Sequence, residues 1–187
     1  MYQRNIESEV REALSDTRPV VLINGARQTG KSTLALKFAA DLSVRYITLD
    51  DATVLSSATS DPTGFVRNLD SFVVIDEVQK APRLFPAIKA HVDKNRRPGN
   101  FLLTGSANVM MLPRLAESLA GRMEIITLWP LSQGELMSRQ ERFIEGSFAS
   151  RLPALTDAVE SDTNLLQTLI TGGYSEVVRR NTESRRR

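Results

Sequence analysis

Eight consecutive residues near the amino end of the chain have the spacing of a phosphate-binding loop. In order they are Gly25, Ala26, Arg27, Gln28, Thr29, Gly30, Lys31 and Ser32. They match G-x-x-x-x-G-K-[ST] at every fixed position. The glycines let the loop curl so that successive backbone N–H groups point at phosphate oxygens. The sequence therefore predicts an ATP site over this loop, and we include Thr33, which follows it.

Two side chains of this loop have specific roles in the prediction. Lys31 is expected to reach the β- and γ-phosphates, and the Ser32 hydroxyl is expected to bind Mg²⁺. A helix that begins near Lys31 adds the positive end of its dipole. An accidental glycine-rich turn is the alternative. It is disfavoured because the motif follows an apolar run and precedes a helical segment.

A second apolar run ends in two carboxylates, Asp76 and Glu77. In a parallel sheet, the carboxyl ends of the strands form the binding crevice. Asp76 is therefore expected to hold Mg²⁺, and Glu77 to polarise the attacking water as a general base. For Asp76 the alternative is a helix cap. A water-activating glutamate favours an ATP hydrolase over a phosphotransferase, which passes the phosphoryl group to a bound acceptor.

Two further positions are weaker candidates. Thr104 ends the run Phe101–Leu103 and is expected to contact the γ-phosphate or the attacking water, with Ser106 as the next candidate; a hydroxyl that only caps the following helix is the alternative. Arg122 follows Gly121 at the end of a predicted helix. It could stabilise charge in the transition state or be a surface arginine near a helix end.

Strands and helices alternate over the first 130 residues. Helical spacing predicts helices over 4–16, 32–42, the segment around Ile88, and the segment between Pro113 and Gly121. Short apolar runs predict buried strands, as in a parallel sheet. These runs are Val20–Ile23, Val44–Leu49, Phe72–Ile75, Phe101–Leu103 and Met123–Leu128. We expect a core domain over 1–130 and a smaller helical part over 131–187.

Composition narrows the function classes. The 187 residues are 41% hydrophobic and 25% charged, as in ordinary globular proteins. There is no cysteine, which fits a reducing cytoplasm, and no apolar run approaches the roughly 18 residues of a membrane span. Five arginines and two glutamates give residues 176–187 a charge of +3, so the preceding residues sum to −1. Nucleic-acid binding by the main domain is therefore not indicated.

These motifs, taken in order, resemble those of the AAA-type P-loop ATPases. More narrowly, the chain is similar to a prokaryotic group in which an N-terminal AAA domain precedes a C-terminal domain of unknown function. The stretches that carry the resemblance span nearly the whole chain, and the most specific are DEVQ, LTGSA, SLAGR and GGY. The Walker A motif of these ATPases corresponds to the phosphate loop, and their Walker B motif corresponds to Asp76 with Glu77.

The resemblance implies an α/β P-loop fold with five parallel strands in the order 5-1-4-3-2, followed by a helical lid that is truncated here. It implies Thr104 as the first sensor and Arg122 as an arginine finger, acting in cis or across a homo-oligomer. It also implies a C-terminal effector domain in the full-length protein. Arg179 and Arg180 are candidates for a second sensor.

Three functions remain open at this point. The first is an ATPase that couples hydrolysis to a conformational change in an attached or partner domain. The second is a slow nucleotide-dependent switch, as the resemblance of some members of this group to parts of toxin–antitoxin or defence loci suggests. The third is a phosphotransferase. We also expect His91 to be structural, Asp50 and Asp51 to cap the following helix, and Trp129 to pack at the junction between core and lid.

Overall fold

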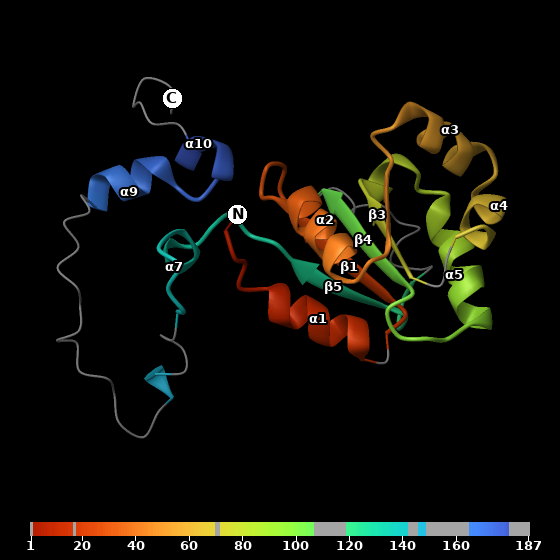
Figure 1. The fold of residues 1–187 in the computed structure, drawn as a ribbon, viewed down its shortest axis with the longest axis horizontal. Coiled ribbons are helices and arrows are strands. Elements are labelled where there is room, and N and C mark those ends of the chain that lie inside the picture. Colours follow the sequence, from red (N-terminus) through yellow and green to blue (C-terminus); the bar gives the residue numbers. More distant parts are fainter. Residues whose placement is uncertain are drawn as a thin grey trace. The chain divides into compact units, whose positions relative to one another are not determined.

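The core is a five-stranded parallel sheet (Figure 1). The computed structural model describes residues 2–16, 18–69, 72–106, 119–141, 146–148 and 165–179. The strands are β1 (Val20–Gly25), β2 (Arg45–Thr48), β3 (Val73–Asp76), β4 (Phe101–Ser106) and β5 (Met123–Thr127). Their order, β2-β3-β4-β1-β5, confirms the predicted order, read from the other edge. Each predicted strand exists, with bounds that differ by at most three residues.

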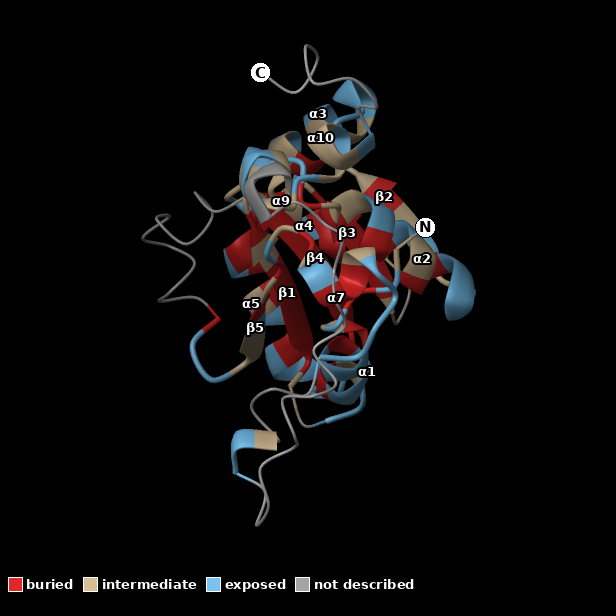
Figure 2. Ribbon diagram, turned by 90° about the vertical axis from the view of Figure 1, so that its left-hand side faces the viewer, coloured by how far each residue is buried: buried red, intermediate tan, exposed pale blue. Residues whose placement is uncertain are grey.

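Helices cover both faces of this sheet (Figure 1). Those of the core are α1 (Glu7–Ser15), α2 (Lys31–Asp41), α3 (Ala52–Ser60), α4 (Pro62–Arg67), the 3₁₀ turn η1 (Val78–Lys80) and α5 (Leu84–Lys94). Val21 and Ile23 of β1 pack in one hydrophobic cluster with α1 and α2. Val20 and Leu22 pack in the other with α3, α4 and α5. β1 is therefore buried on both sides, as its continuous apolar run predicts (Figure 2).

The first helix is shorter than predicted. It begins at Glu7 and not at residue 4, because Arg4 and Asn5 make other contacts. Arg4 forms a buried ion pair with Glu135 at 3.1 Å, and the backbone N–H of Asn5 donates to the same carboxylate at 2.7 Å. Glu135 also closes a capping box with Ser132 at the start of α7 (Gln133–Leu136).

Two helices lie between β2 and β3, where the sequence predicted only a helix start at Asp50 and Asp51 and no bounds. α3 is rich in serine and threonine, which are weak helix formers, so its apolar periodicity is poor. Its start is fixed by Asp51, whose side chain accepts from the N–H groups of Thr53 and Val54. This confirms the capping role expected for Asp51, whereas Asp50 pairs with Lys80 at 2.5 Å. Asp61 caps α4 in the same way, with Pro62 in its first turn.

The chain divides into two compact units, residues 6–129 and residues 1–5 with 130–187. The second unit contains α7, α9 (Leu165–Thr171) and α10 (Ser175–Arg179), which ends at one of the two arginines considered for a second sensor. The other, Arg180, lies outside the described residues. Gly173 allows close backbone contact there, since an added Cβ would lie 2.1 Å from the Leu131 carbonyl oxygen.

Three further sequence expectations have different outcomes. Most of the helix predicted between Pro113 and Gly121 lies outside the described residues. Trp129, for which a packing role at the junction between core and lid stays a prediction, has 72% of its surface exposed. His91 packs edge-to-face on Phe101 with ring centroids 5.6 Å apart, which fits a structural role.

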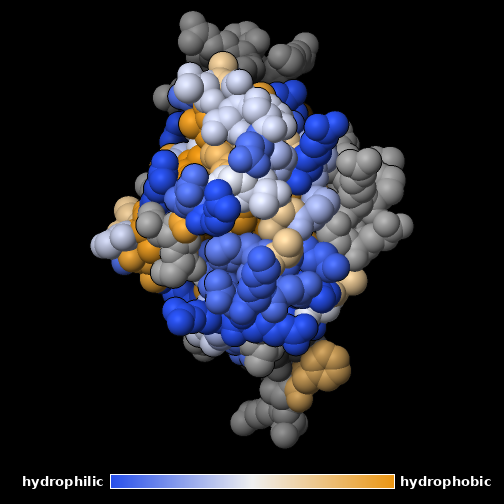
Figure 3. Space-filling model, turned by 90° about the vertical axis from the view of Figure 1, so that its right-hand side faces the viewer, coloured by the Kyte–Doolittle hydropathy of each residue, from blue (hydrophilic) through white to orange (hydrophobic). Residues whose placement is uncertain are grey.

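The surface seen from the side of α3, α4 and α5 is mostly hydrophilic (Figure 3). The apolar side chains of these helices therefore point into the core. Within the described part of the chain, no helix is both long enough and apolar enough to cross a membrane.

Candidate nucleotide-binding site

The loop between β1 and α2 has the backbone of a phosphate cradle. β1 ends at Gly25, and α2 begins at Lys31. Gly30 has a φ of 96° and Gln28 a φ of 65°, so the loop curls through two left-handed positions. Gly25 is required because the backbone of a neighbouring segment comes close to it. A Cβ there would lie 2.4 Å from the carbonyl oxygen of Leu128, just after β5. The loop is thus held against the neighbouring strand.

Lys31 is buried beneath this loop, with 5% of its surface exposed. Its Nζ donates to the Ala26 carbonyl oxygen at 2.7 Å, and the Thr29 hydroxyl donates to the same oxygen at 2.9 Å. Burial lowers the pKa of Lys31, and the charges of Glu77 and Asp76 oppose that shift. An ammonium group has three N–H donors, so two remain for an anion that would compensate the cost of burial.

Asp76 lies at the end of β3 and is 2% exposed. Tyr46 of β2 donates its phenol to Oδ2 at 2.8 Å, and the Thr104 hydroxyl of β4 donates to Oδ1. Burial and then the bond to Asp76 raise the pKa of Tyr46, so its phenol remains a donor. Each carboxylate oxygen can accept more than one hydrogen bond. The carboxylate is therefore oriented from both sides and retains acceptor capacity.

Glu77 directly follows β3, at the point where the chain turns out of the sheet. Its φ of 60° and ψ of 40° turn the chain into η1. Its backbone N–H donates to the Thr104 hydroxyl at 3.1 Å, so that one hydroxyl bridges Asp76 and Glu77. Thr104 is fully buried, and among the described residues its hydroxyl contacts Asp76 and Glu77. The segment after β4, where a capped helix was the alternative, lies outside the described residues. The structure thus brings Thr104, at the end of β4, together with Asp76 and Glu77, at the end of β3.

Two residues at this site were missed by the sequence reasoning. Tyr46 was read only as part of an apolar run, and its contact with Asp76 depends on the pairing of β2 with β3. Gln79 donates to the Glu77 carboxylate and accepts from the backbone N–H of Ser106 at 3.3 Å. The only signal for Gln79 was its place in the DEVQ stretch.

The donors and acceptors at this edge fit a magnesium–triphosphate group. Backbone N–H groups at the start of α2 and the Lys31 ammonium suit phosphate oxygens. The Ser32 hydroxyl, in the first turn of α2, and the Asp76 carboxylate are oxygen ligands of the kind Mg²⁺ prefers. These groups follow β1 and β3, with β4 between them. The edge can therefore hold a phosphate chain, a hard cation and a water molecule near a carboxylate.

Arg122 lies at the amino ends of the strands, whereas the phosphate loop lies at their carboxyl ends. It immediately precedes β5, and its carbonyl accepts from the N–H of Val20 at 3.2 Å. Its guanidinium bonds Asp93 at 2.5 Å and the Ala120 carbonyl at 3.0 Å. This arginine is the strongest influence on Asp93, whose pKa it lowers. A five-residue strand spans about 16 Å, so Arg122 is roughly a strand length from the phosphate loop of its own chain.

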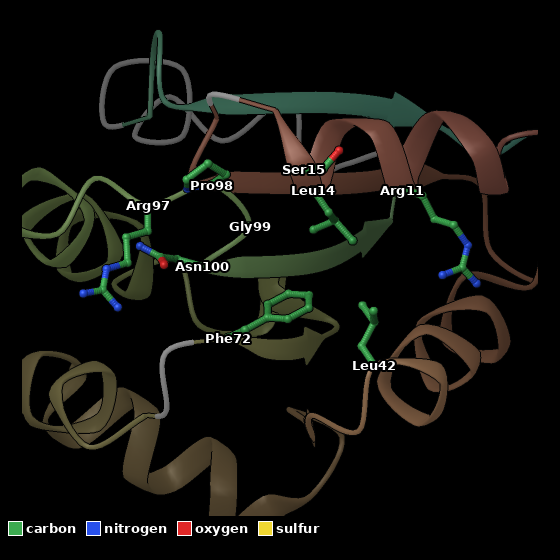
Figure 4. Close-up of a pocket in the computed structure, with 9 residues that line it drawn as sticks. All are labelled: Arg11, Leu14, Ser15, Leu42, Phe72, Arg97, Pro98, Gly99 and Asn100. Atoms are coloured by element: carbon green, nitrogen blue, oxygen red, sulfur yellow. The ribbon is translucent and has the colours of Figure 1, made fainter.

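A cavity of about 420 Å³ lies at that same amino-terminal edge (Figure 4). Leu14, Leu42 and Phe72 point toward one another within it, whereas Arg11 and Arg97 lie at its two ends. Phe72 and Asn100 directly precede β3 and β4. The cavity is therefore separate from the phosphate loop, which lies at the carboxyl ends of the strands.

Comparison with known proteins agrees with this geometry. The sequence profile of a family described as AAA domain matches residues 17–137. Uncharacterized proteins of Mycobacterium tuberculosis and Mycobacterium bovis are 37% identical over 129 residues, covering 67% of this chain and 28% of each relative. AMPPCP-bound DnaA from Aquifex aeolicus matches with a TM-score of 0.53 and 14% identity, over 91% of this chain and 57% of that one. At that identity the match supports the fold alone.

Proposed function

We propose, from the premise that this chain belongs to the family of AAA domains, that it binds ATP with Mg²⁺ and hydrolyses it to ADP and phosphate. The family supports nucleotide binding and hydrolysis in general. The observation that carries the specific proposal is the juxtaposition of three strand ends. Lys31 follows β1, while Thr104 of β4 bridges Asp76 and Glu77 of β3.

In this proposal the phosphate loop and Lys31 hold the triphosphate, and Ser32 with Asp76 hold the metal. Bound Mg²⁺ neutralises charge on the phosphate oxygens. Glu77 accepts a proton from water as the water oxygen bonds to the γ-phosphorus and the bond to the bridging oxygen breaks. Thr104 and Tyr46 keep the Asp76 carboxylate in place through the two hydroxyl contacts described above.

Arg122 enters the proposal only through a second copy of the chain. Its position at the amino end of β5 is about a strand length from its own phosphate loop, which argues against action in cis. An arginine on the surface of one subunit can supply transition-state charge to the site of the next. We therefore propose a homo-oligomer in which Arg122 leaves Asp93 to complete a neighbouring site.

The work done by this cycle is also a proposal. The curated relatives are much longer than the stretch they share with this chain, which is 28% of their length. Regions of that kind, attached or on a partner, are where a nucleotide-driven conformational change would act. The AAA domain alone does not specify the task, because one fold serves many functions.

A slow nucleotide switch is the second candidate. It is favoured by the hydrogen bond between Gln79 and Glu77, which occupies part of the carboxylate that must accept the proton. A switch would bind ATP and change conformation with little turnover. Multiple turnovers without an added acceptor would favour the hydrolase over both the switch and a phosphotransferase.

The first test of the proposed function is nucleotide binding by Lys31→Ala. Removal of the ammonium contact with the phosphates should weaken binding by about 1.5–3 kcal/mol, or roughly 10- to 150-fold. Titration with a fluorescent ATP analogue in the presence of Mg²⁺ measures this loss. Lys94→Ala, which removes an exposed lysine at the end of α5, is the matched control. Equal affinities for wild type and Lys31→Ala would refute the assignment.

A further inference from the structure

At the carboxyl ends of the strands, near the phosphate loop, β4 extends further than β3. They pair from Val73 opposite Phe101 to Ile75 opposite Leu103. β3 then turns away at Glu77, whereas β4 continues to Ser106. The last residues of β4 therefore have a neighbour on the β1 side but have lost their strand neighbour on the β3 side. A backbone N–H there needs another acceptor.

Gln79 of η1 supplies that acceptor. Its Oε1 accepts from the N–H of Ser106 at 3.3 Å, and its Nε2 donates to a carboxylate oxygen of Glu77. The orientation of the amide follows from chemistry, because a backbone N–H only donates and a carboxylate only accepts. One half-buried side chain thus joins the Glu77 carboxylate to the end of β4.

The register of the sheet extends this connection to the phosphate loop. Ser106 is opposite Gly25, the first residue of the loop, in the pairing of β4 with β1. Because β4 lies between β3 and β1, a contact that draws the Glu77 carboxylate toward β4 also draws it toward the loop. The backbone of Glu77 is fixed from the same strand, through the Thr104 hydroxyl. The backbone and the carboxylate of Glu77 are therefore both held in position relative to β4.

We propose that Gln79 is a positioning residue for ATP hydrolysis, which fixes the Glu77 carboxylate relative to the phosphate loop through Ser106. The proposal rests on the proposed function, in which Glu77 accepts the proton of the attacking water. Gln79 itself touches neither nucleotide nor water in this account. Small displacements of a reacting group are costly, because about 1 Å can slow a reaction by roughly 100-fold.

Two variants separate the two hydrogen bonds of Gln79. Gln79→Met keeps a similar length and removes both. Gln79→Glu keeps an acceptor for Ser106 but replaces the donor with a negative charge facing Glu77. For both variants we expect kcat to fall by about 10- to 100-fold, while KM and the affinity for an ATP analogue stay within about twofold. Gln133→Met, at an exposed position of α7, is the matched control and should leave kcat unchanged.

A double-mutant cycle shows whether Gln79 acts through Glu77. In a Glu77→Gln background the carboxylate is already absent, so Gln79→Met should slow single-turnover hydrolysis by no more than about twofold. Full additivity of the two effects would overturn the positioning role. A kcat equal to that of wild type in both Gln79 variants would also overturn it, and so would a raised kcat, which the slow switch predicts. A loss of ATP binding in both variants would assign Gln79 to the fold.

The same measurements distinguish failure of this proposal from failure of the proposed function. If wild type and Lys31→Ala show equal phosphate release, the protein is not an ATPase of the proposed kind, and the role of Gln79 falls with it. If turnover depends on Lys31 and Glu77 but is unaffected by Gln79→Met, only the positioning role is wrong.

Discussion

Replacement of Thr104 by valine tests the bridge between Asp76 and Glu77. Valine keeps the shape of threonine but removes the hydroxyl. In the structure this hydroxyl donates to the Asp76 carboxylate and accepts the N–H of Glu77 at 3.1 Å, at a position with 0% exposure. A hydrogen bond to a charged group contributes about 1.5–3 kcal/mol. Water can replace the second bond in part, because Glu77 is only half-buried. We therefore expect a loss of about 2–3 kcal/mol.

Urea denaturation of the wild type and three variants measures this loss. Thr104→Ser keeps the hydroxyl and loses one methyl group, so it should cost only about 1 kcal/mol. Thr53→Val is the control at an exposed position of α3 and should stay within about 0.5 kcal/mol. If Thr104→Val is as stable as wild type, or if the serine variant is the less stable of the two, the hydroxyl does not make the bridge described here.

Two more predictions concern the sheet edge opposite the phosphate loop and the second unit. Arg122→Ala should retain ATP binding and lose hydrolysis by about 10³-fold or more, and mixing it with Lys31→Ala should restore activity; full activity of Arg122→Ala alone would contradict a finger role. The Ser132 hydroxyl, and then the Gly134 N–H, lower the pKa of Glu141. A lowered pKa means that the ionised form stabilises the fold above the ordinary value of 4.5 and that this contribution is lost as the pH falls further. Melting curves should show an acid-dependent loss of stability that is smaller in Glu141→Gln than in wild type, and an identical pH dependence in both proteins would argue against this role of Glu141.

The sheet was predictable because its signals are local. β1, β3 and β4 each begin with a continuous apolar run and end in a glycine or a polar residue, such as Gly25 or Asp76. The curl of the loop follows from glycine at Gly30, whose φ of 96° is unfavourable for other residues. Strand order, by contrast, came from the resemblance to AAA-type ATPases and not from the residues.

The helices between β2 and β3 show where local signals compete. α3 and α4 have good start signals, since Asp51 and Asp61 are N-caps and Pro62 suits a first turn. The sequence indicates the cap at Asp51 but does not set the bounds of the helix that follows it. The residues inside α3 are mostly small or β-branched, and they bury only Ala58 fully. Weak apolar periodicity therefore hid a helix whose cap was visible.

The unpredicted site residues depend on contacts between distant segments. Tyr46 reaches Asp76 only because β2 pairs with β3 in a particular register. The Gln79 side chain accepts from the Ser106 N–H because β4 extends two residues beyond the end of β3. Arg122 could be named as a candidate, but its partner Asp93 comes from α5, 29 residues away along the chain. Such partners follow from topology, which a single sequence does not display.

The most direct test of the central claim is single-turnover phosphate release by Glu77→Gln, with ATP and Mg²⁺ and excess protein. The amide preserves size and hydrogen-bonding capacity but removes the basic oxygen. We predict that this variant binds the ATP analogue with wild-type affinity and hydrolyses ATP at least roughly 100-fold more slowly. A wild-type rate of phosphate release would contradict the account and assign Glu77 to the structure of the turn after β3.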